Sequence, residues 1–189
     1  MKFSDVFKEN ILNIPNLLTL LRILLLPFLL YFSYYYFHGI YYYINYVIIL
    51  AILIFFTDFL DGFIARKFNL VTKFGKYFDP IADMLTILCI LSLLVIIKNF
   101  PFWIFLLYII RELGSIYIGS YLYFKKDKQA EPSFLGKLTT SFAFLLILWY
   151  YIEDFIHINA IYGAYCFSIL ILITFIESYF RFKQDILES

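Results

Sequence analysis

Six long apolar runs constrain this 189-residue chain more than any other feature. Hydrophobic residues make up 63% of the sequence and charged residues 15%, whereas a soluble domain is about half apolar and about a quarter charged. Each run approaches the roughly 20 apolar residues that a helix needs to cross a bilayer. We therefore predict an all-α integral membrane protein with six transmembrane helices, in which residues 1–189 form a single membrane domain.

The predicted spans cover residues 16–37, 42–66, 80–98, 101–124, 135–152 and 158–180. The third span is expected to begin with Asp79 as the N-cap and Pro80 at the first helical position, where proline is favoured. Residues 2–13 place apolar side chains near one face and charged side chains elsewhere. This pattern predicts a short interfacial helix that lies on the membrane, with a frayed, solvated terminus as the alternative.

Lysine and arginine are concentrated in three segments, at residues 66–76, 125–137 and 181–183. With six spans, all three segments fall on one side of the membrane, and the positive-inside rule makes that side cytoplasmic. We therefore expect a multi-pass protein of the inner, cytoplasmic membrane with both termini in the cytoplasm. The acidic stretch described next would lie at the cytoplasmic face.

Residues 58–83 read DFLDGFIARKFNLVTKFGKYFDPIAD and carry four carboxylates at the edge of the apolar spans. Charge at membrane depth is costly and marks a functional site by default. Asp58 and Asp61 are three residues apart, and Asp79 and Asp83 are four apart, so each pair shares one face of a helix. The spacing predicts that the two pairs face a common site.

Four carboxylates in a partly desolvated site would take up protons or hold cations. Ligation by oxygen alone suits Mg²⁺, Mn²⁺ or Ca²⁺ better than zinc, and neither Cys nor His occurs in the stretch. A pair of such ions is a common means of neutralising phosphates during displacement at phosphorus. The chemistry of the stretch thus favours a site for phosphoryl compounds.

Small residues and one arginine accompany the acids. Gly62 and Ala65 follow Asp58 on the same side of the helix, and Gly75 lies before the second pair of acids. They would let a ligand approach the backbone or let helices pack closely. Arg66 can hold a phosphate through two hydrogen bonds or anchor the helix end at the cytoplasmic surface.

The stretch resembles the signature of the CDP-alcohol phosphatidyltransferases. The matching positions are Asp58, Asp61, Gly62, Ala65, Arg66, Gly75, Asp79 and Asp83. That family transfers a phosphatidyl or similar group from a CDP-linked donor to a hydroxyl acceptor and releases CMP.

The resemblance implies a role for each of these residues. The four aspartates would bind two ions, Mg²⁺ or Mn²⁺, and Asp83 would also act as the general base. The cytidine diphosphate would contact Asp61, Gly62, Ala65, Arg66 and Gly75. The resemblance further implies a homodimer in the lipid bilayer, and no nucleic acid is expected as a partner.

Other segments resemble one branch of the family, the phosphatidylglycerophosphate synthases, which join CDP-diacylglycerol to glycerol 3-phosphate. These segments are NIPNLLTLLR at residues 13–22, the Arg111–Glu112 pair, and Gly136–Lys137. The phosphorylated acceptor would then contact Arg111, Lys137 and Lys73. An ion pair between helices is the alternative role for Arg111 and Glu112.

The chain departs from that branch at Met84 and Thr139, where a lysine is usual. Cardiolipin synthases, which use phosphatidylglycerol as acceptor, are therefore the nearest alternative, ahead of inositol-phosphate and serine transferases. Asn16, Thr19 and Arg22 form a polar stripe in the first span. This stripe would line the nucleotide side of the site or make hydrogen bonds between helices.

An ion or proton transporter is the alternative from a different class, because buried acids in membranes often serve transport. A transporter would be expected to distribute its charges along a transmembrane path and to show inverted repeats. Here the acids of the motif gather near one membrane face, and the sequence shows no repeat. The enzyme interpretation is therefore preferred.

Overall fold

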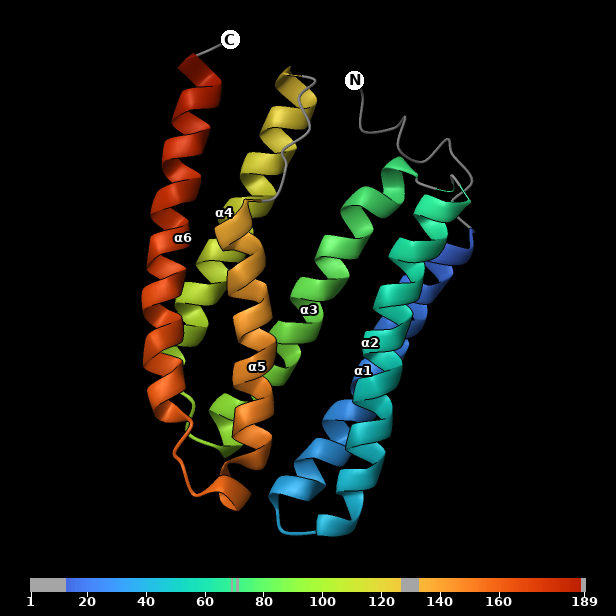
Figure 1. Ribbon diagram of the computed structural model, residues 1–189, viewed down its shortest axis with the longest axis vertical. Helices are drawn as coiled ribbons and strands as arrows, with labels where there is room; N and C mark the ends of the chain where they lie inside the picture. Colours follow the sequence, from blue (N-terminus) through green and yellow to red (C-terminus); the bar gives the residue numbers. More distant parts are fainter. Residues whose placement is uncertain (1–12, 69, 71, 127–132, 188–189) are drawn as a thin grey trace. The chain divides into compact units, whose positions relative to one another are not determined.

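A computed structural model describes residues 13–68, 70, 72–126 and 133–187. Throughout these residues the secondary structure is helical, without a strand, which confirms the predicted fold class (Figure 1). The helices are α1 Ile14–Phe37, α2 Ile44–Lys67, α3 Lys73–Ile97, α4 Phe102–Lys126, α5 Phe134–Ile156 and α6 Ile161–Leu187, with a short 3₁₀ helix η2 at Tyr41–Tyr43. The predicted interfacial helix at residues 2–13 lies outside the described residues, apart from Asn13.

All six α-helices are long enough and apolar enough to span a membrane. Their surfaces carry large apolar side chains, with Phe55 70% exposed and Ile96 and Phe134 each 76% exposed. Exposing these apolar side chains to water is unfavourable, whereas exposing them to the hydrocarbon of a bilayer is not. The chain is therefore a multi-pass membrane protein whose outer surface suits lipid.

The start of α3 differs from the prediction. The helix begins at Lys73, so Pro80 lies inside it rather than at its first position. The hydroxyl of Thr72 accepts a hydrogen bond of 3.0 Å from the backbone N–H of Gly75, which is an N-cap interaction. Asp79 is not the cap, and its carboxylate instead accepts a hydrogen bond from Thr19 of α1. The prediction was wrong because it took the first proline as the start of the helix and overlooked Thr72 as a cap.

The chain divides into two compact units, residues 1–93 and 94–189. In the first unit, α1 and α2 lie side by side and are joined by a tight turn at His38–Ile40 (Figure 1). Gly39 in this turn has φ +89°, a conformation that glycine adopts without strain. The turn allows α1 and α2 to run antiparallel, and their far ends carry much of the site described below.

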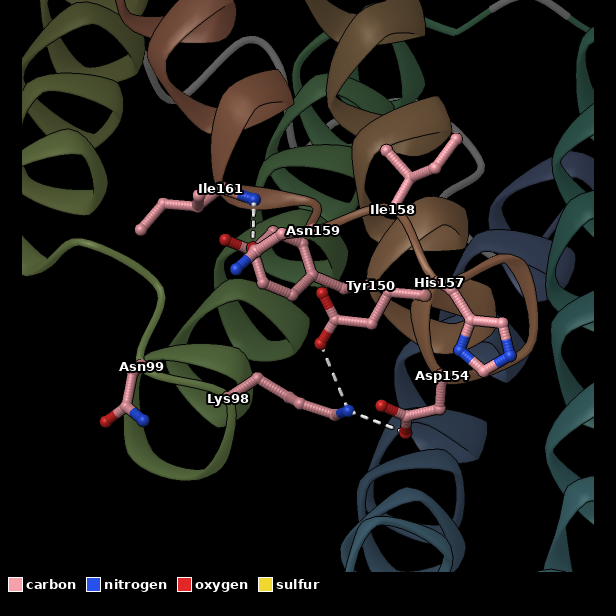
Figure 2. A pocket seen from close by; sticks show the side chains of 9 residues that line it. Lys98, Asn99, Tyr150, Asp154, His157, Ile158, Asn159 and Ile161 are labelled. Atoms are coloured by element: carbon pink, nitrogen blue, oxygen red, sulfur yellow. Dashed lines mark hydrogen bonds and ion pairs between the residues drawn. The ribbon is translucent and has the colours of Figure 1, made fainter.

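In the second unit, α6 lies against both α4 and α5. Lys98, just after α3, reaches the last turns of α5 and lies 3.1 Å from Glu153 Oε1 and 2.8 Å from Asp154 Oδ2. Lys98, Glu153 and Asp154 line an open cavity of about 530 Å³, and dashed lines in Figure 2 mark the contacts of Lys98. The contacts tie the end of α3 to the end of α5.

Candidate functional site

The acids of residues 58–83 meet beside α1 and form what we term the carboxylate cluster: Asp58 and Asp61 from α2, with Asp79 and Asp83 from α3. The hydroxyl oxygen of Thr19 on α1 lies 2.6 Å from Asp79 Oδ1 and 3.2 Å from Asp61 Oδ2. Because a hydroxyl carries one proton, it donates to one of these carboxylates at a time, and Asp79 is the closer. This contact links the acids of two helices through a third.

Arg22 of α1 lies at the centre of the carboxylate cluster. Its Nη2 is 2.8 Å from Asp58 Oδ1 and 2.6 Å from Asp61 Oδ2, and its Nη1 pairs with Asp83. The residue is only 1% exposed. Such charge-assisted bonds are stronger than neutral ones, so one guanidinium holds three of the four acids together.

The carboxylate cluster contains four acidic side chains and one guanidinium, so its acidic groups outnumber its basic group. Its acids also differ in exposure. The side chain of Asp61 is 4% exposed, whereas those of Asp58 and Asp83 are 48% and 40% exposed. The cluster is therefore closed at Asp61 and accessible at Asp58 and Asp83.

The donor set suits hard divalent cations, since every side chain of the carboxylate cluster offers carboxylate oxygens. Within the described residues, however, no group of three or more His, Cys, Asp or Glu side chains forms a ready-made metal site. The guanidinium of Arg22 lies against oxygens of Asp58 and Asp61 that would otherwise be available to an ion. The chemistry of the cluster fits a cation, provided that Arg22 yields some of these oxygens.

The two glycines of the motif have different surroundings. A Cβ atom on Gly75 would lie 2.8 Å from Asn16 Oδ1, so this glycine allows α3 to approach α1. A Cβ on Gly62 would meet only Arg66 Nη2, at an ordinary 3.6 Å. Packing thus explains Gly75 but gives no reason for Gly62. Ala65 is half-buried and Arg66 is exposed, on the same helix as Gly62.

The start of α1 is fixed to the start of α3 by polar contacts. The side chain of Asn13 accepts a hydrogen bond of 3.0 Å from the backbone of Asn16 and donates one of 3.0 Å to the carbonyl of Leu70. The side chain of Asn16 donates to the hydroxyl of Thr72 over 3.4 Å. These contacts hold the helix starts in the register that the carboxylate cluster requires.

Arg111 of α4 is 7% exposed and pairs with its neighbour Glu112. Its Nη2 donates to the carbonyl of Gly136 at the start of α5, over 3.3 Å. A Cβ on Gly136 would lie 3.2 Å from that Nη2, so the glycine makes room for the guanidinium. The ion pair is thus within one helix, and the contact between helices runs from Arg111 to a backbone carbonyl.

Lys137 follows Gly136 and is exposed in the first turn of α5. The structure therefore places two of the predicted acceptor-binding residues, Arg111 and Lys137, at neighbouring positions in the second unit. Lys73 begins α3 in the first unit, and its side chain lies outside the described residues. The carboxylate cluster lies entirely within the first unit.

Sequence reasoning did not assign Arg22 and Thr19 to the carboxylate cluster. The polar stripe Asn16, Thr19 and Arg22 left open whether these residues line the site or join helices. Asn16 joins α1 to the residue before α3, whereas Thr19 and Arg22 do both, because the groups they contact on α2 and α3 are acids of the carboxylate cluster. The signal was present in their spacing of three residues, which places them on one face of an apolar span. The sequence does not show which segments of the chain pack against this face.

Fold and site together define a multi-pass membrane protein in which three helices assemble a carboxylate cluster around a buried arginine. The chain matches the CDP-alcohol phosphatidyltransferase family over residues 12–176. This match covers most of the sequence, and the chain belongs to that family.

Several relatives carry the name CDP-diacylglycerol–glycerol-3-phosphate 3-phosphatidyltransferase. The protein from Wigglesworthia glossinidia brevipalpis is 35% identical over 187 residues, covering 94% of this chain and 99% of that protein. The Aquifex aeolicus protein is 35% identical over 139 residues, covering 72% and 74% of the two chains. The Rickettsia felis protein is 44% identical over 82 residues, and this match spans 43% of the chain and 44% of that relative's length.

Proposed function

We propose that this protein transfers the phosphatidyl group of CDP-diacylglycerol to glycerol 3-phosphate, giving phosphatidylglycerophosphate and CMP. The observation that carries the proposal is the carboxylate cluster, in which α1 gathers all four acids of the family motif. The names of the relatives from Wigglesworthia and Aquifex support the choice of donor and acceptor.

The carboxylate cluster is proposed to hold two divalent cations, Mg²⁺ or Mn²⁺, through the side chains of Asp58, Asp61, Asp79 and Asp83. When bound, such ions neutralise the charge of the donor pyrophosphate and of the departing CMP. The excess of acidic over basic groups in the cluster and the exposure of Asp58 and Asp83 support this role.

The donor is proposed to lie along α2. Gly62 has space for a ligand beside the backbone, and the exposed Arg66 can bind a phosphate through two parallel hydrogen bonds. Ala65 has only a methyl side chain, so it leaves room for the ligand between Gly62 and Arg66. Asp61 would contact the nucleotide as well as the cations. Gly75, which the family motif also assigns to the nucleotide, has a packing role in this chain and would act by setting the approach of α3.

Asp83 is proposed as the general base. Its side chain is 40% exposed, so an acceptor hydroxyl can approach it, and a base within hydrogen-bonding reach takes up the proton as the oxygen attacks phosphorus. The bond from phosphorus to the CMP oxygen breaks as the new phosphate ester forms. Removal of the proton prevents the attacking oxygen from carrying positive charge into the product.

The acceptor is proposed to bind through Arg111, Lys137 and Lys73. Glycerol 3-phosphate carries a phosphate that needs cationic partners. Arg111 is already ordered by Gly136 and Glu112, and its Nε has no hydrogen-bond partner among the described residues. A buried donor left without a partner is costly, so a ligand that satisfied it would bind favourably.

We also infer the setting of the enzyme. It would lie in the inner, cytoplasmic membrane as a homodimer, with residues 1–189 forming one functional domain, both termini in the cytoplasm, and the carboxylate cluster at the cytoplasmic face. The diacyl chains of the donor would remain in the bilayer while CMP leaves to the aqueous side. The distribution of lysine and arginine supports this orientation.

The test is CMP release by the purified protein with CDP-diacylglycerol, Mg²⁺ or Mn²⁺, and a series of acceptors. We expect CMP release with glycerol 3-phosphate and little with phosphatidylglycerol, inositol phosphate or serine. Release with phosphatidylglycerol alone would identify a cardiolipin synthase and contradict the acceptor assignment. A lack of CMP with every acceptor would contradict the enzymatic function.

A further inference from the structure

Arg22 occupies the position at which a cation would meet the carboxylate cluster. Its Nη2 lies within 2.8 Å of both Asp58 Oδ1 and Asp61 Oδ2, whereas a divalent ion binds carboxylate oxygens at about 2.0–2.6 Å. An ion on those two oxygens would therefore face a guanidinium at close range, and the two positive charges would repel. Arg22 and a cation compete for the same oxygens.

The acids are the only described partners of the Arg22 guanidinium. The residue is 1% exposed, and its Nε has no hydrogen-bond partner within the part of the chain that the structure describes. An arginine with a purely structural role in a buried site would be expected to satisfy its donors. Here every bond of the guanidinium goes to an acid of the carboxylate cluster, namely Asp58, Asp61 and Asp83.

From these contacts we propose that Arg22 is the resident counter-ion of the carboxylate cluster. It neutralises and gathers the acids when no divalent cation is bound, and it gives up oxygens of Asp58 and Asp61 when a cation enters. Arg22 is thus a positioning residue that acts through the acids, and it weakens the affinity of the protein for free cations. The inference rests on the proposed function only in taking the cluster to be a cation site.

The test measures Mn²⁺ binding to the purified full-length protein without donor or acceptor, by the electron paramagnetic resonance signal of free Mn²⁺. Arg22→Gln removes the competing charge, and we expect it to bind Mn²⁺ about tenfold or more tightly than the original protein. Arg22→Lys keeps the charge, and we expect its affinity to remain close to the original. If Arg22 merely filled space, the Mn²⁺ affinities of Arg22→Gln and Arg22→Lys would not differ with the charge of the side chain.

Arg181→Gln is the matched control. Arg181 lies in α6, 52% exposed, and pairs with Glu177 at 3.4 Å, so the variant loses the same charge outside the carboxylate cluster. We expect its Mn²⁺ affinity to be unchanged. An equal gain in both glutamine variants would show a general charge effect and would overturn the specific role of Arg22.

Folding of Arg22→Gln provides a second measurement. The variant leaves four acids without a counter-ion, so Mn²⁺ should raise its thermal stability more than that of the original protein. Recovery of folded variant only in the presence of Mn²⁺ would support the proposal. Failure to fold even with Mn²⁺, or unchanged or weaker Mn²⁺ affinity, would overturn it. If neither the original protein nor Arg22→Gln binds Mn²⁺, the cluster is not a cation site and the proposal fails with it, whereas Mn²⁺ binding by Arg22→Gln alone would support the proposal.

Discussion

Gly62 and Gly75 belong to one sequence motif, but the structure gives them different constraints. Gly75 is in close contact with Asn16, whereas Gly62 has space beside it. Sequence reasoning offered ligand approach and helix packing for both residues and could not decide, because the answer depends on which neighbour each glycine meets. Packing accounts for Gly75, and ligand approach stays a prediction for Gly62.

Alanine substitutions separate the two roles. Gly75→Ala should lower the free energy of unfolding by about 1–3 kcal/mol, because its methyl group would press on the buried Asn16. Gly62→Ala should leave stability unchanged or raise it by up to about 1 kcal/mol, since alanine favours helix. It should instead raise KM for CDP-diacylglycerol on the order of tenfold. Thermal unfolding measures the stability of each variant, and CMP release measures its KM for CDP-diacylglycerol. Equal changes in stability and in KM for the two variants would contradict this distinction.

Asp83 combines exposure with a contact to Arg22. If it is the base, Asp83→Asn should lower kcat by about 10²–10⁴-fold, the range typical for loss of a general base. Mn²⁺ binding should be largely retained, because three carboxylates remain. Asp154→Asn is a control with the same chemical change in a residue that pairs with Lys98 in the second unit. Unchanged turnover in Asp83→Asn would remove Asp83 as the base.

Among the elements, α3 shows what the sequence could and could not predict. Its apolar run and the spacing of Asp79 and Asp83 were sufficient to predict a helix with both acids on one face. Its start was not predicted, because Pro80 is a stronger local signal than Thr72, although a helix can continue through proline at a cost. Contacts of Thr72 with Asn16 and Gly75 stabilise the earlier start, and such tertiary contacts leave no periodic trace in the sequence.

The link between the end of α3 and the end of α5 depends on Lys98. Burial alone would lower the Lys98 pKa, but hydrogen bonds to Asp154 and Glu153 outweigh burial and raise the pKa above its ordinary value. A raised pKa means that the link stabilises the fold below about pH 10.5 and is lost as the pH rises through the folded-state pKa.

Lys98→Met removes this link. At neutral pH it should lower the free energy of unfolding by about 1 kcal/mol or less, the range of partly exposed ion pairs. The difference in melting temperature between the two proteins should shrink as the pH rises above about 10.5. Thermal unfolding from pH 7 to 12 measures this difference in melting temperature. A difference that stayed constant over this range would show that the charge of Lys98 does not contribute to stability.

At the scale of the whole molecule, composition predicted six membrane helices, and the structure confirms them. Composition could do so because the cost of placing polar backbone and charged groups in lipid dominates every other local preference. The central place of Arg22 was not predicted, because its importance arises from three separate segments that meet only after folding. Sequence alone offered two uses for the polar stripe, and the tertiary contacts show that Thr19 and Arg22 both join helices and contact the acids of the cluster.

The orientation remains a prediction that fusions can test. A green fluorescent protein fused to the C-terminus should fluoresce, because it folds in the cytoplasm, and alkaline phosphatase at the same place should be inactive. A matched pair of fusions in the turn at residues 157–160 should give the opposite result. Active phosphatase at the C-terminus would reverse the orientation and place the carboxylate cluster away from the cytoplasm.

Phosphatidyl transfer at the carboxylate cluster is tested most directly by following radiolabelled glycerol 3-phosphate into lipid. We expect the purified protein to convert the label into a solvent-extractable product only when both CDP-diacylglycerol and Mg²⁺ or Mn²⁺ are present. We also expect Asp61→Asn, at the closed side of the carboxylate cluster, to abolish the conversion. Label that stays in the aqueous phase with the original protein, or lipid formation that survives Asp61→Asn, would contradict the proposed phosphatidyl transfer at this cluster.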